Sequence, residues 1–409
     1  MANPKPHPFW WERDTTPGYV LLAAAILSFA LSNSALTPAW KALLAAPVEL
    51  TIGGYQLISS VKAMVKDALM AVFFLYVGLE LKRECVEGPF RNPREAALPA
   101  LGAIGGMAAP ALIFLTVAGD EFSRGWAIPT ATDIAFAVGV LSLLGARVPA
   151  GVRLFLLALA IADDLGAILV IALFYSGALK MSALAVSALL TLALFVLNWR
   201  GVRALTPYWI LGVLLWGAMA QTGMSPTLAG VLTALAIPMH RPDGRSPLVA
   251  AEHALKVPVQ LGIMPIFALA SAGVSLAGVD GADLMHPVAL GIAAGLVLGK
   301  PIGIVTLTWI GSKVLRQALP ASPLALLGTA MIAGIGFTMS LFVGALAFPE
   351  EAMQAPVRFG VLGGSLISAC FGLALLALAL PRGTPTARSE ELAEQEATAE
   401  AEGVLDKRT

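Results

Sequence analysis

The sequence predicts an all-α integral membrane protein that crosses the bilayer twelve times, and three observations lead to this prediction. The 409 residues are 58% hydrophobic and only 13% charged, with a mean hydropathy of +0.82, whereas soluble chains carry about 25% charged residues. Twelve mostly apolar runs approach the roughly 20 residues that a membrane-spanning helix needs. Lys and Arg then sort to one side of these runs, as membrane topology requires.

The twelve runs follow one another through most of the chain, separated by charged residues, glycines and prolines. None alternates with the period of a barrel strand, so helices are predicted. The eighth run is the shortest. The expected spans are 19–36, 61–80, 96–118, 126–145, 151–175, 181–198, 204–220, 225–238, 257–275, 288–311, 323–347 and 357–380.

This count predicts the orientation of the chain. Nineteen Lys and Arg lie in the even-numbered loops and the two termini, and six lie in the odd-numbered loops and the helix ends beside them. Because cytoplasmic loops are enriched in these residues, both termini are expected in the cytoplasm. Residues 1–18 form the N-terminus, without the pattern of a removed signal peptide, and 19–380 form a single twelve-helix domain.

Two segments are expected outside the helical domain. Residues 46–60 contain two short β-prone runs around Gly53-Gly54, which predicts a β-hairpin in the first external loop. Residues 381–409 carry seven acidic and four basic residues. This composition predicts a solvated, mobile cytoplasmic tail without chemistry of its own.

Composition excludes several classes of protein. The 26 basic and 26 acidic residues balance, which gives no support for nucleic-acid binding. Cys85 and Cys370 lie far apart and the four histidines are scattered, so no zinc site or disulfide framework is predicted. No phosphate-binding loop is present, so neither ATP nor any other cofactor is expected.

Four charged residues fall at the middle of expected spans. Asp163 and Asp164 lie at the middle of the fifth span, and Lys300 lies at the middle of the tenth. Asp133 lies near the middle of the fourth. Each charge at the bilayer centre costs on the order of 3 kcal/mol, and such residues usually mark ion or proton pathways. Neighbouring residues point about 100° apart on a helix, so one aspartate can pair with Lys300 while the other faces a cavity.

Two spans are expected to be interrupted. Pro129 precedes Thr130 and Thr132 in the fourth span, and proline disfavours continuous helix. Residues 334–338, Gly-Ile-Gly-Phe-Thr, weaken the eleventh span in the same way. Each lies in the middle of a triplet of spans, a pattern typical of the binding site of a secondary transporter. Asp133 is expected to balance the partial positive charge of half-helix N-termini. Lys300 is expected to balance the partial negative charge of half-helix C-termini.

Five motifs together resemble the NhaA-type bacterial Na+/H+ antiporters over nearly the whole chain, up to about residue 380. They lie at 71–84, 131–137, 160–167, 298–303 and 334–340 and include Gly78-Leu-Glu-Leu-Lys-Arg-Glu84 and Ala162-Asp-Asp-Leu165. The resemblance implies twelve helices with an inverted repeat, in which interrupted helices 4 and 11 cross.

The resemblance also implies roles for residues. Asp164 is similar to the family's primary ion ligand, Asp163 to the partner that alternates between ion binding and a salt bridge with Lys300, and Thr132 to a further ligand of the transported Na+ or Li+. The implied activity is electrogenic export of Na+ across the bacterial inner membrane against entering H+. Its role would lie in pH and sodium homeostasis and salt tolerance.

Further positions match family features away from the ion site. Glu80, Arg83, Glu84, Glu252 and His253 match a cytoplasmic funnel implicated in activation at alkaline pH, and segment 46–60 matches a hairpin used for homodimer formation. The chain departs from common family residues, in ways that concern the pH set-point, at Ser225, Val249, Lys256 and Ser271.

Four other classes of protein compete with this interpretation. An intramembrane aspartyl protease needs Tyr-Asp and Gly-x-Gly-Asp, but Thr132 and Ala162 precede the aspartates here. A prenyl-transfer enzyme needs Asp-Asp-x-x-Asp, and a retinal photoprotein does not fit twelve spans. The chain is therefore not expected to be an enzyme. A proton-coupled transporter of another cation or small solute on the same fold remains the alternative.

Overall fold

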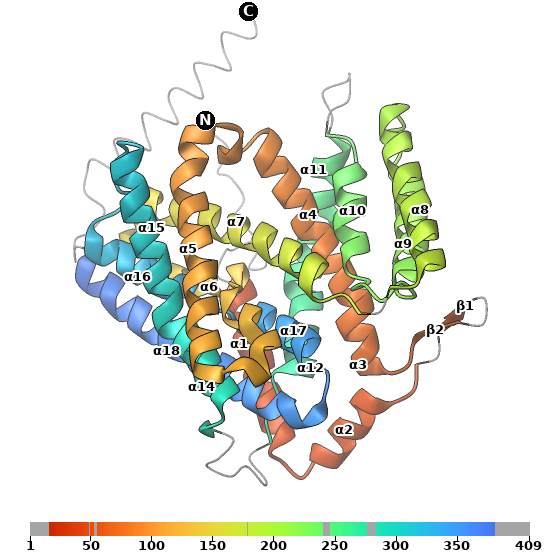
Figure 1. Ribbon diagram of the computed structural model, residues 1–409, viewed down its shortest axis with the longest axis horizontal. Coiled ribbons are helices and arrows are strands. Elements are labelled where there is room, and N and C mark those ends of the chain that lie inside the picture. Colours follow the sequence, from red (N-terminus) through yellow and green to blue (C-terminus); the bar gives the residue numbers. More distant parts are fainter. Residues whose placement is uncertain are drawn as a thin grey trace, which may run out of the picture.

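The computed structural model describes residues 16–48, 50–52, 55–177, 179–239, 246–275 and 284–380. Within these residues the chain is mainly helical (Figure 1). Residues 1–15, which make up most of the expected N-terminus 1–18, lie outside the described residues. The acidic tail 381–409 also lies outside them. The uninterrupted helices are α1 (Thr16–Ser32), α2 (Thr37–Ala45), α5 (Pro93–Ala118), α7 (Ala150–Phe174), α8 (Met181–Trp199), α9 (Thr206–Met219), α10 (Leu228–Ala236) and α18 (Glu351–Ala379).

Three longer helical segments each contain a short π-helical stretch, where the backbone winds more widely than in an α-helix. They are α3 (Val61–Ala63), η2 (Met64–Leu69) and α4 (Met70–Val86); α11 (Pro247–Pro258), η6 (Val259–Ile263) and α12 (Met264–Ser271); and α14 (Pro287–Ala294), η7 (Gly295–Gly299) and α15 (Lys300–Val314).

Two more segments are broken. The 3-10 helix η4 (Asp120–Thr130) and α6 (Ile134–Ser142) meet at 51°, and α16 (Pro323–Ala333) and α17 (Phe337–Ala347) meet at 48°. The short 3-10 turns η3 (Pro89–Arg91) and η5 (Gly145–Arg147) lie in connections. The structure therefore has breaks in both segments where the sequence predicts interruption.

Each of the twelve expected spans overlaps a helical segment, but length and hydropathy alone do not identify twelve crossings. Among the described residues, six helices are long and apolar enough to cross a membrane, or up to nine if each of three bent pairs is one span. The other helical segments at expected spans are α3–α4, the shorter apolar helix α9, and α10. Nine residues of α10 rise only about 14 Å, well short of the hydrocarbon thickness.

The first span differs from its expected range of 19–36. Helix α1 ends at Ser32, and α2 leaves it at 112°. The Asn33 side chain donates to the carbonyls of Phe29 (2.8 Å) and Val274 (2.7 Å), which satisfies acceptors at the turn. Pro38 then lies in the first turn of α2, where proline is favoured. The helix at 37–45 was not predicted.

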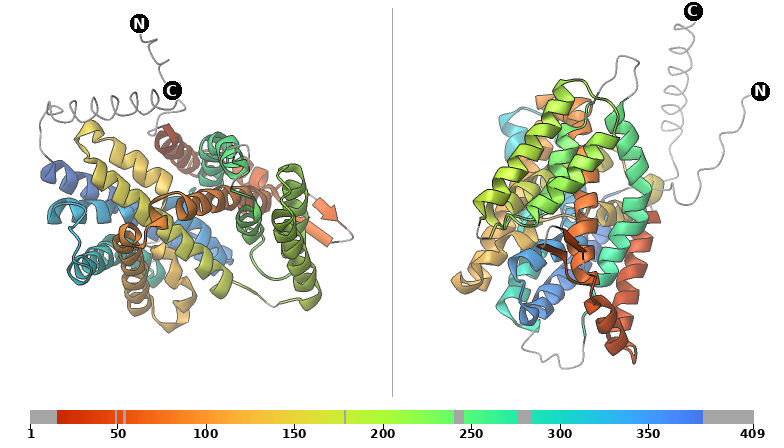
Figure 2. Two further views of the ribbon diagram at one scale, coloured as in Figure 1. Left: turned by 90° about the horizontal axis from the view of Figure 1, so that it is seen from above. Right: turned by 90° about the vertical axis from the view of Figure 1, so that its right-hand side faces the viewer.

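Segment 46–60 contains two short antiparallel strands, β1 (Leu50–Ile52) and β2 (Tyr55–Ile58), paired as Thr51 with Gln56 and Ile52 with Tyr55. The two glycines between the strands lie outside the described residues. In Figure 2 the strands project from the side of the helical domain.

The helices form two neighbouring groups (Figure 1). In one, α5 packs against α7, α14 and α15, and α18 packs against α14 and α16; in the other, α10 packs against α4 and α9, and α9 against α8. Gly105 and Gly303 face each other between α5 and α15, so closely that a Cβ on either would collide with the carbonyl oxygen of the other. Small residues allow this approach of the two backbones. As a result, Lys300, one turn before Gly303, is held beside α5.

Candidate ion site and a second charge cluster

The two helix breaks lie against each other at the centre of the molecule. Residues 131–133 leave helical conformation after η4, and residues 334–336 separate α16 from α17. The backbone N–H of Asp133 donates to the carbonyl of Ile335 (2.8 Å), and the hydroxyl of Thr132 donates to the carbonyl of Ala333 (2.9 Å). These hydrogen bonds hold the two breaks together and satisfy backbone groups that no membrane lipid could satisfy.

Asp133 links the N-termini of two half-helices. One carboxylate oxygen accepts a hydrogen bond from the backbone N–H of Phe136 (3.0 Å) in the first turn of α6. The other accepts from the backbone N–H (3.1 Å) and the hydroxyl of Thr338 in the first turn of α17. The side chain is fully buried. A carboxylate here offsets the partial positive charge at both helix N-termini.

Lys300 and Asp163 form a buried ion pair. The Lys300 Nζ lies 2.8 Å from Asp163 Oδ2, and the two residues are 1% and 2% exposed. The same ammonium donates to the carbonyl of Thr130, the last residue of η4. It therefore also offsets the partial negative charge at a half-helix C-terminus. The π-helical stretch η7 immediately precedes Lys300 and changes the direction in which α15 presents it.

Asp164 lies next to this pair but is not part of it. It is 6% exposed, and its carboxylate has no hydrogen-bond partner among the described residues. Unfavourable charge interactions connect it with Asp163, Glu80 and Asp133. Buried polar groups almost always have a partner, so a buried carboxylate without one is a candidate for binding a proton or a cation.

Thr132 lies beside Asp163, close enough to interact electrostatically with its carboxylate. Its hydroxyl oxygen keeps acceptor capacity after donating to Ala333. The residues that the sequence places at the ion site, Asp164, Asp163 and Thr132, are thus brought together, with Lys300 and Asp133 adjacent. The set offers carboxylate, hydroxyl and backbone carbonyl oxygens, which are the ligands preferred by hard cations.

A second charge cluster lies toward the C-terminal end of α4. Arg83 forms ion pairs with Glu84 (2.9 Å) and Glu252 on α11 (2.8 Å). Glu80 interacts electrostatically with all three. The structure therefore gathers four of the five residues expected in the cytoplasmic funnel. The fifth, His253, is exposed on α11 next to the buried Glu252.

Two functional contacts were not expected from the sequence. Thr338 was noted only as part of a glycine-rich motif, yet it is the partner of Asp133. The sequence marks Lys82 as a positive charge in the motif at 78–84, but does not predict that its Nζ donates to the carbonyls of Leu235 (2.6 Å) and Ile237 (2.5 Å) at the C-terminal end of α10. Burial lowers the pKa of Lys82 to about 8.

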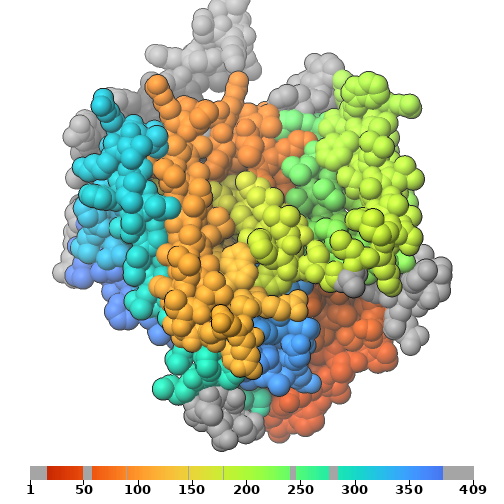
Figure 3. Space-filling view, viewed as in Figure 1, coloured from red at the N-terminus to blue at the C-terminus, as the bar shows by residue number. Residues whose placement is uncertain are grey.

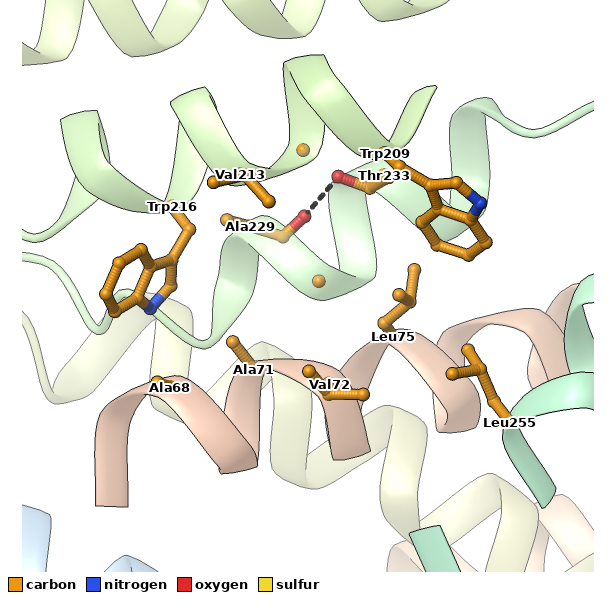
Figure 4. Close-up of a pocket in the computed structure, with 12 residues that line it drawn as sticks. Ala68, Ala71, Val72, Leu75, Trp209, Val213, Trp216, Ala229, Thr233 and Leu255 are labelled. Atoms are coloured by element: carbon orange, nitrogen blue, oxygen red, sulfur yellow. Dashed lines mark hydrogen bonds between the residues drawn. The ribbon is translucent and has the colours of Figure 1, made fainter. Parts of the chain in front are cut away.

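A cavity of about 420 Å³ lies away from these charges, between α4, α9, α10 and α11 (Figure 4). Its lining includes Trp209, Trp216 and Leu75. The one side-chain hydroxyl in the lining, that of Thr233, donates to the carbonyl of Ala229 (2.7 Å). It holds no charged side chain, so it cannot supply the ligands that an ion needs.

Two helix breaks that lie against each other, with buried acids and a lysine beside them, are typical of the ion-transport class of membrane proteins. A family model described as Na+/H+ antiporter 1 matches residues 10–376. The chain therefore belongs to this family of multi-pass membrane proteins.

Similar proteins carry the same description. The chain is 47% identical over 377 residues to the Na+/H+ antiporter NhaA of Pseudomonas putida (strain GB-1), covering 90% of this chain and 96% of that protein. It is 49% identical over 374 residues to NhaA of Bordetella parapertussis, covering 89% and 94%. For NhaA of Psychrobacter arcticus the identity is 44% over 373 residues, covering 90% and 93%.

Proposed function

We propose that the protein is a secondary-active antiporter that exports Na+ or Li+ while protons enter, with both ions competing for Asp164 and Asp163. The environment of Asp164 is the main support for this proposal. The buried Asp164 carboxylate lacks a hydrogen-bond partner among the described residues, beside an Asp163 whose Oδ2 is paired with Lys300 and whose buried Oδ1 has no such partner either. Such a carboxylate is stabilised by binding either a proton or a cation, which makes occupancy by one exclude the other.

The exchange follows from the chemistry of these side chains. Na+ binds the oxygens of Asp164, Asp163 and Thr132, and the Asp163 carboxylate leaves Lys300 to do so. In the Na+-bound state Asp164 is ionised, and the separated Asp163 and Lys300 have released one proton between them. When two protons arrive, one neutralises Asp164, the other restores the ion pair of Asp163 with Lys300, and Na+ leaves. Because Asp163 and Lys300 form one coupled system, the second proton belongs to the pair and not to either residue alone. Two protons per sodium ion make the cycle electrogenic.

Alternating access requires that the site open to each side of the membrane in turn. The crossed breaks supply the irregular backbone at which half-helices can rearrange, and the two triplets, spans 3–5 and 10–12, would be the halves of an inverted repeat. The proposed topology has twelve spans with both termini in the cytoplasm. The distribution of Lys and Arg supports this orientation in a bacterial inner membrane.

The charge cluster around Arg83 is the proposed site of activation at alkaline pH. Glu80 interacts with both this cluster and Asp164, so a change of charge in the cluster alters the electrostatic field at the ion site. Strands β1 and β2 are the proposed contact of a homodimer. The cellular role that follows is pH and sodium homeostasis, with tolerance to salt.

The decisive experiment follows proton movement with a pH-sensitive dye in proteoliposomes when Na+ or Li+ is added. Wild-type protein should show cation-dependent proton flux, and Asp164→Asn should abolish it. Asp120→Asn, at an exposed position of η4, is the matched control and should retain the flux.

Two results would overturn parts of the proposal. No response to either cation at any pH would leave the alternative, a proton-coupled transporter of another cation or small solute. A full response in Asp164→Asn would keep the function but move the ion site elsewhere.

A further inference from the structure

We propose that the C-terminal end of α15 is a binding site for the head group of an anionic phospholipid, separate from the ion site. A hollow of about 470 Å³ lies there, lined by Lys313, Arg316, Trp309, Ser312 and Gln317 among others. It is far larger than the roughly 30 Å³ that one water occupies. In Figure 3 the end of α15, coloured cyan, lies at the edge of the helical domain beside α5.

The charges of this hollow favour an anion. Lys313 and Arg316 are both exposed, and no ion pair is present for either among the described residues. The sequence contains no Asp or Glu from 284 to 349, so no acid on α15 or its neighbours in sequence neutralises them. The Gln317 side chain donates to the Arg94 carbonyl (2.7 Å), which joins this end of α15 to the start of α5, where Arg94 and Glu95 carry opposite charges.

The surroundings favour a lipid over a free anion. Trp309 is 53% exposed and Val314 is 75% exposed on the flank of α15. Tryptophan is typical of the membrane interface, where its ring contacts acyl chains and its N–H faces the head groups. An apolar flank next to a pair of cations matches an acyl chain next to a phosphate, and Lys and Arg at the end of a transmembrane helix attract anionic head groups.

The backbone at Arg316 is an independent observation. Arg316 has a φ of 53°, and it is the one non-glycine residue with positive φ among those described. The N–H of Gln317 closes the helix by donating to the carbonyl of Ser312 (3.0 Å). Glycine or asparagine usually occupies this left-handed position because other side chains are strained there. An arginine at this position keeps a cation beside Lys313 at the expense of local strain.

The test is native mass spectrometry of the purified full-length protein titrated with phosphatidylglycerol, compared with phosphatidylcholine. The double variant Lys313→Gln, Arg316→Gln should lose one bound phosphatidylglycerol. Each Lys or Arg at an anionic surface contributes about fivefold, so affinity should fall by about 25-fold. The control Arg124→Gln, Lys180→Gln removes two exposed charges elsewhere and should keep the lipid.

Other outcomes would contradict the proposal. Unchanged phosphatidylglycerol binding in the double variant would exclude this site. Equal binding of phosphatidylcholine would show that the charge of the head group does not determine binding. Displacement of the lipid by millimolar inorganic phosphate would indicate a site for a free anion. Lipid binding is measured without transport, so its failure leaves the proposed antiport untouched.

Discussion

The carboxylate of Asp133 accepts a hydrogen bond from the backbone N–H of Thr338, 3.1 Å away, although 205 residues separate them in sequence. The Thr338 hydroxyl donates to the same oxygen. Through this contact one charged side chain caps both half-helices that begin at the crossing, α6 and α17. This carboxylate therefore adds a direct link between α6 and α17 to the hydrogen bonds that already join the two breaks, from Asp133 N–H to Ile335 and from Thr132 to Ala333.

Replacing Asp133 with Asn should destabilise the crossing. The amide oxygen can still accept from Phe136, but the amide NH2 would then face the backbone N–H of Thr338, which can only donate, and the Thr338 hydroxyl would have to rotate to accept. Hydrogen bonds to charged groups contribute about 1.5–3 kcal/mol each, so a loss of this order is expected. The melting temperature in detergent measures it, with Asp120→Asn as the control. An unaltered melting temperature together with unaltered transport would contradict the capping role.

The pair formed by Lys300 and Asp163 should be strongly coupled. Lys300→Met leaves Asp163 buried without its cation, which typically costs about 3–5 kcal/mol. Asp163→Asn leaves the ammonium with only the Thr130 carbonyl. The double variant should be more stable than the sum of the two losses predicts. Thermal unfolding of all four proteins gives the coupling energy, and strict additivity would show that the pair is not formed.

The contact of Gly105 with Gly303 should not tolerate a methyl group. Gly105→Ala would push α5 away from α15 and displace Lys300, so both stability and transport should fall. Gly363→Ala is the matched control, because a Cβ there meets nothing within 4 Å. In that variant, the higher helix propensity of alanine should give equal or slightly greater stability. Equal behaviour of the two variants would mean that close packing does not position Lys300.

The lowered pKa of Lys82 should make the stability of the folded protein depend on pH. Its pKa in the folded protein is about 8, below the ordinary value of 10.5. Between these pH values the unfolded chain binds more protons than the folded chain, so stability contributed by this residue rises with pH across that window. Wild type should therefore gain stability relative to Lys82→Gln from about pH 8 to about pH 10.5.

The measurement for Lys82 is the melting temperature as a function of pH. Lys180→Gln, which removes an exposed lysine, controls for the general effect of charge. A difference between wild type and Lys82→Gln that stays constant through the window would refute the shifted pKa.

The charged residues and helix breakers of this protein are visible in its sequence because the membrane makes them costly. Asp133, Asp163, Asp164 and Lys300 stand out within apolar runs, and Pro129 and the Gly334-Ile-Gly motif indicate interruptions. The family also follows from sequence, since local motifs keep their order along the chain. Helix boundaries are less visible in the sequence: α2 is not predicted, because Trp40 and Lys41 interrupt its apolar pattern.

Which charges meet depends on contacts between distant segments. Asp163 and Asp164 have equivalent sequence surroundings, yet the rotation of α7 directs the first toward Lys300 and leaves the second without a hydrogen-bond partner among the described residues. The same holds for Thr338 at Asp133, for Lys82 at the end of α10, and for the exposure of His253 next to buried Glu252. Helix periodicity fixes the angle between neighbouring side chains, but only packing against other helices determines what each of them faces.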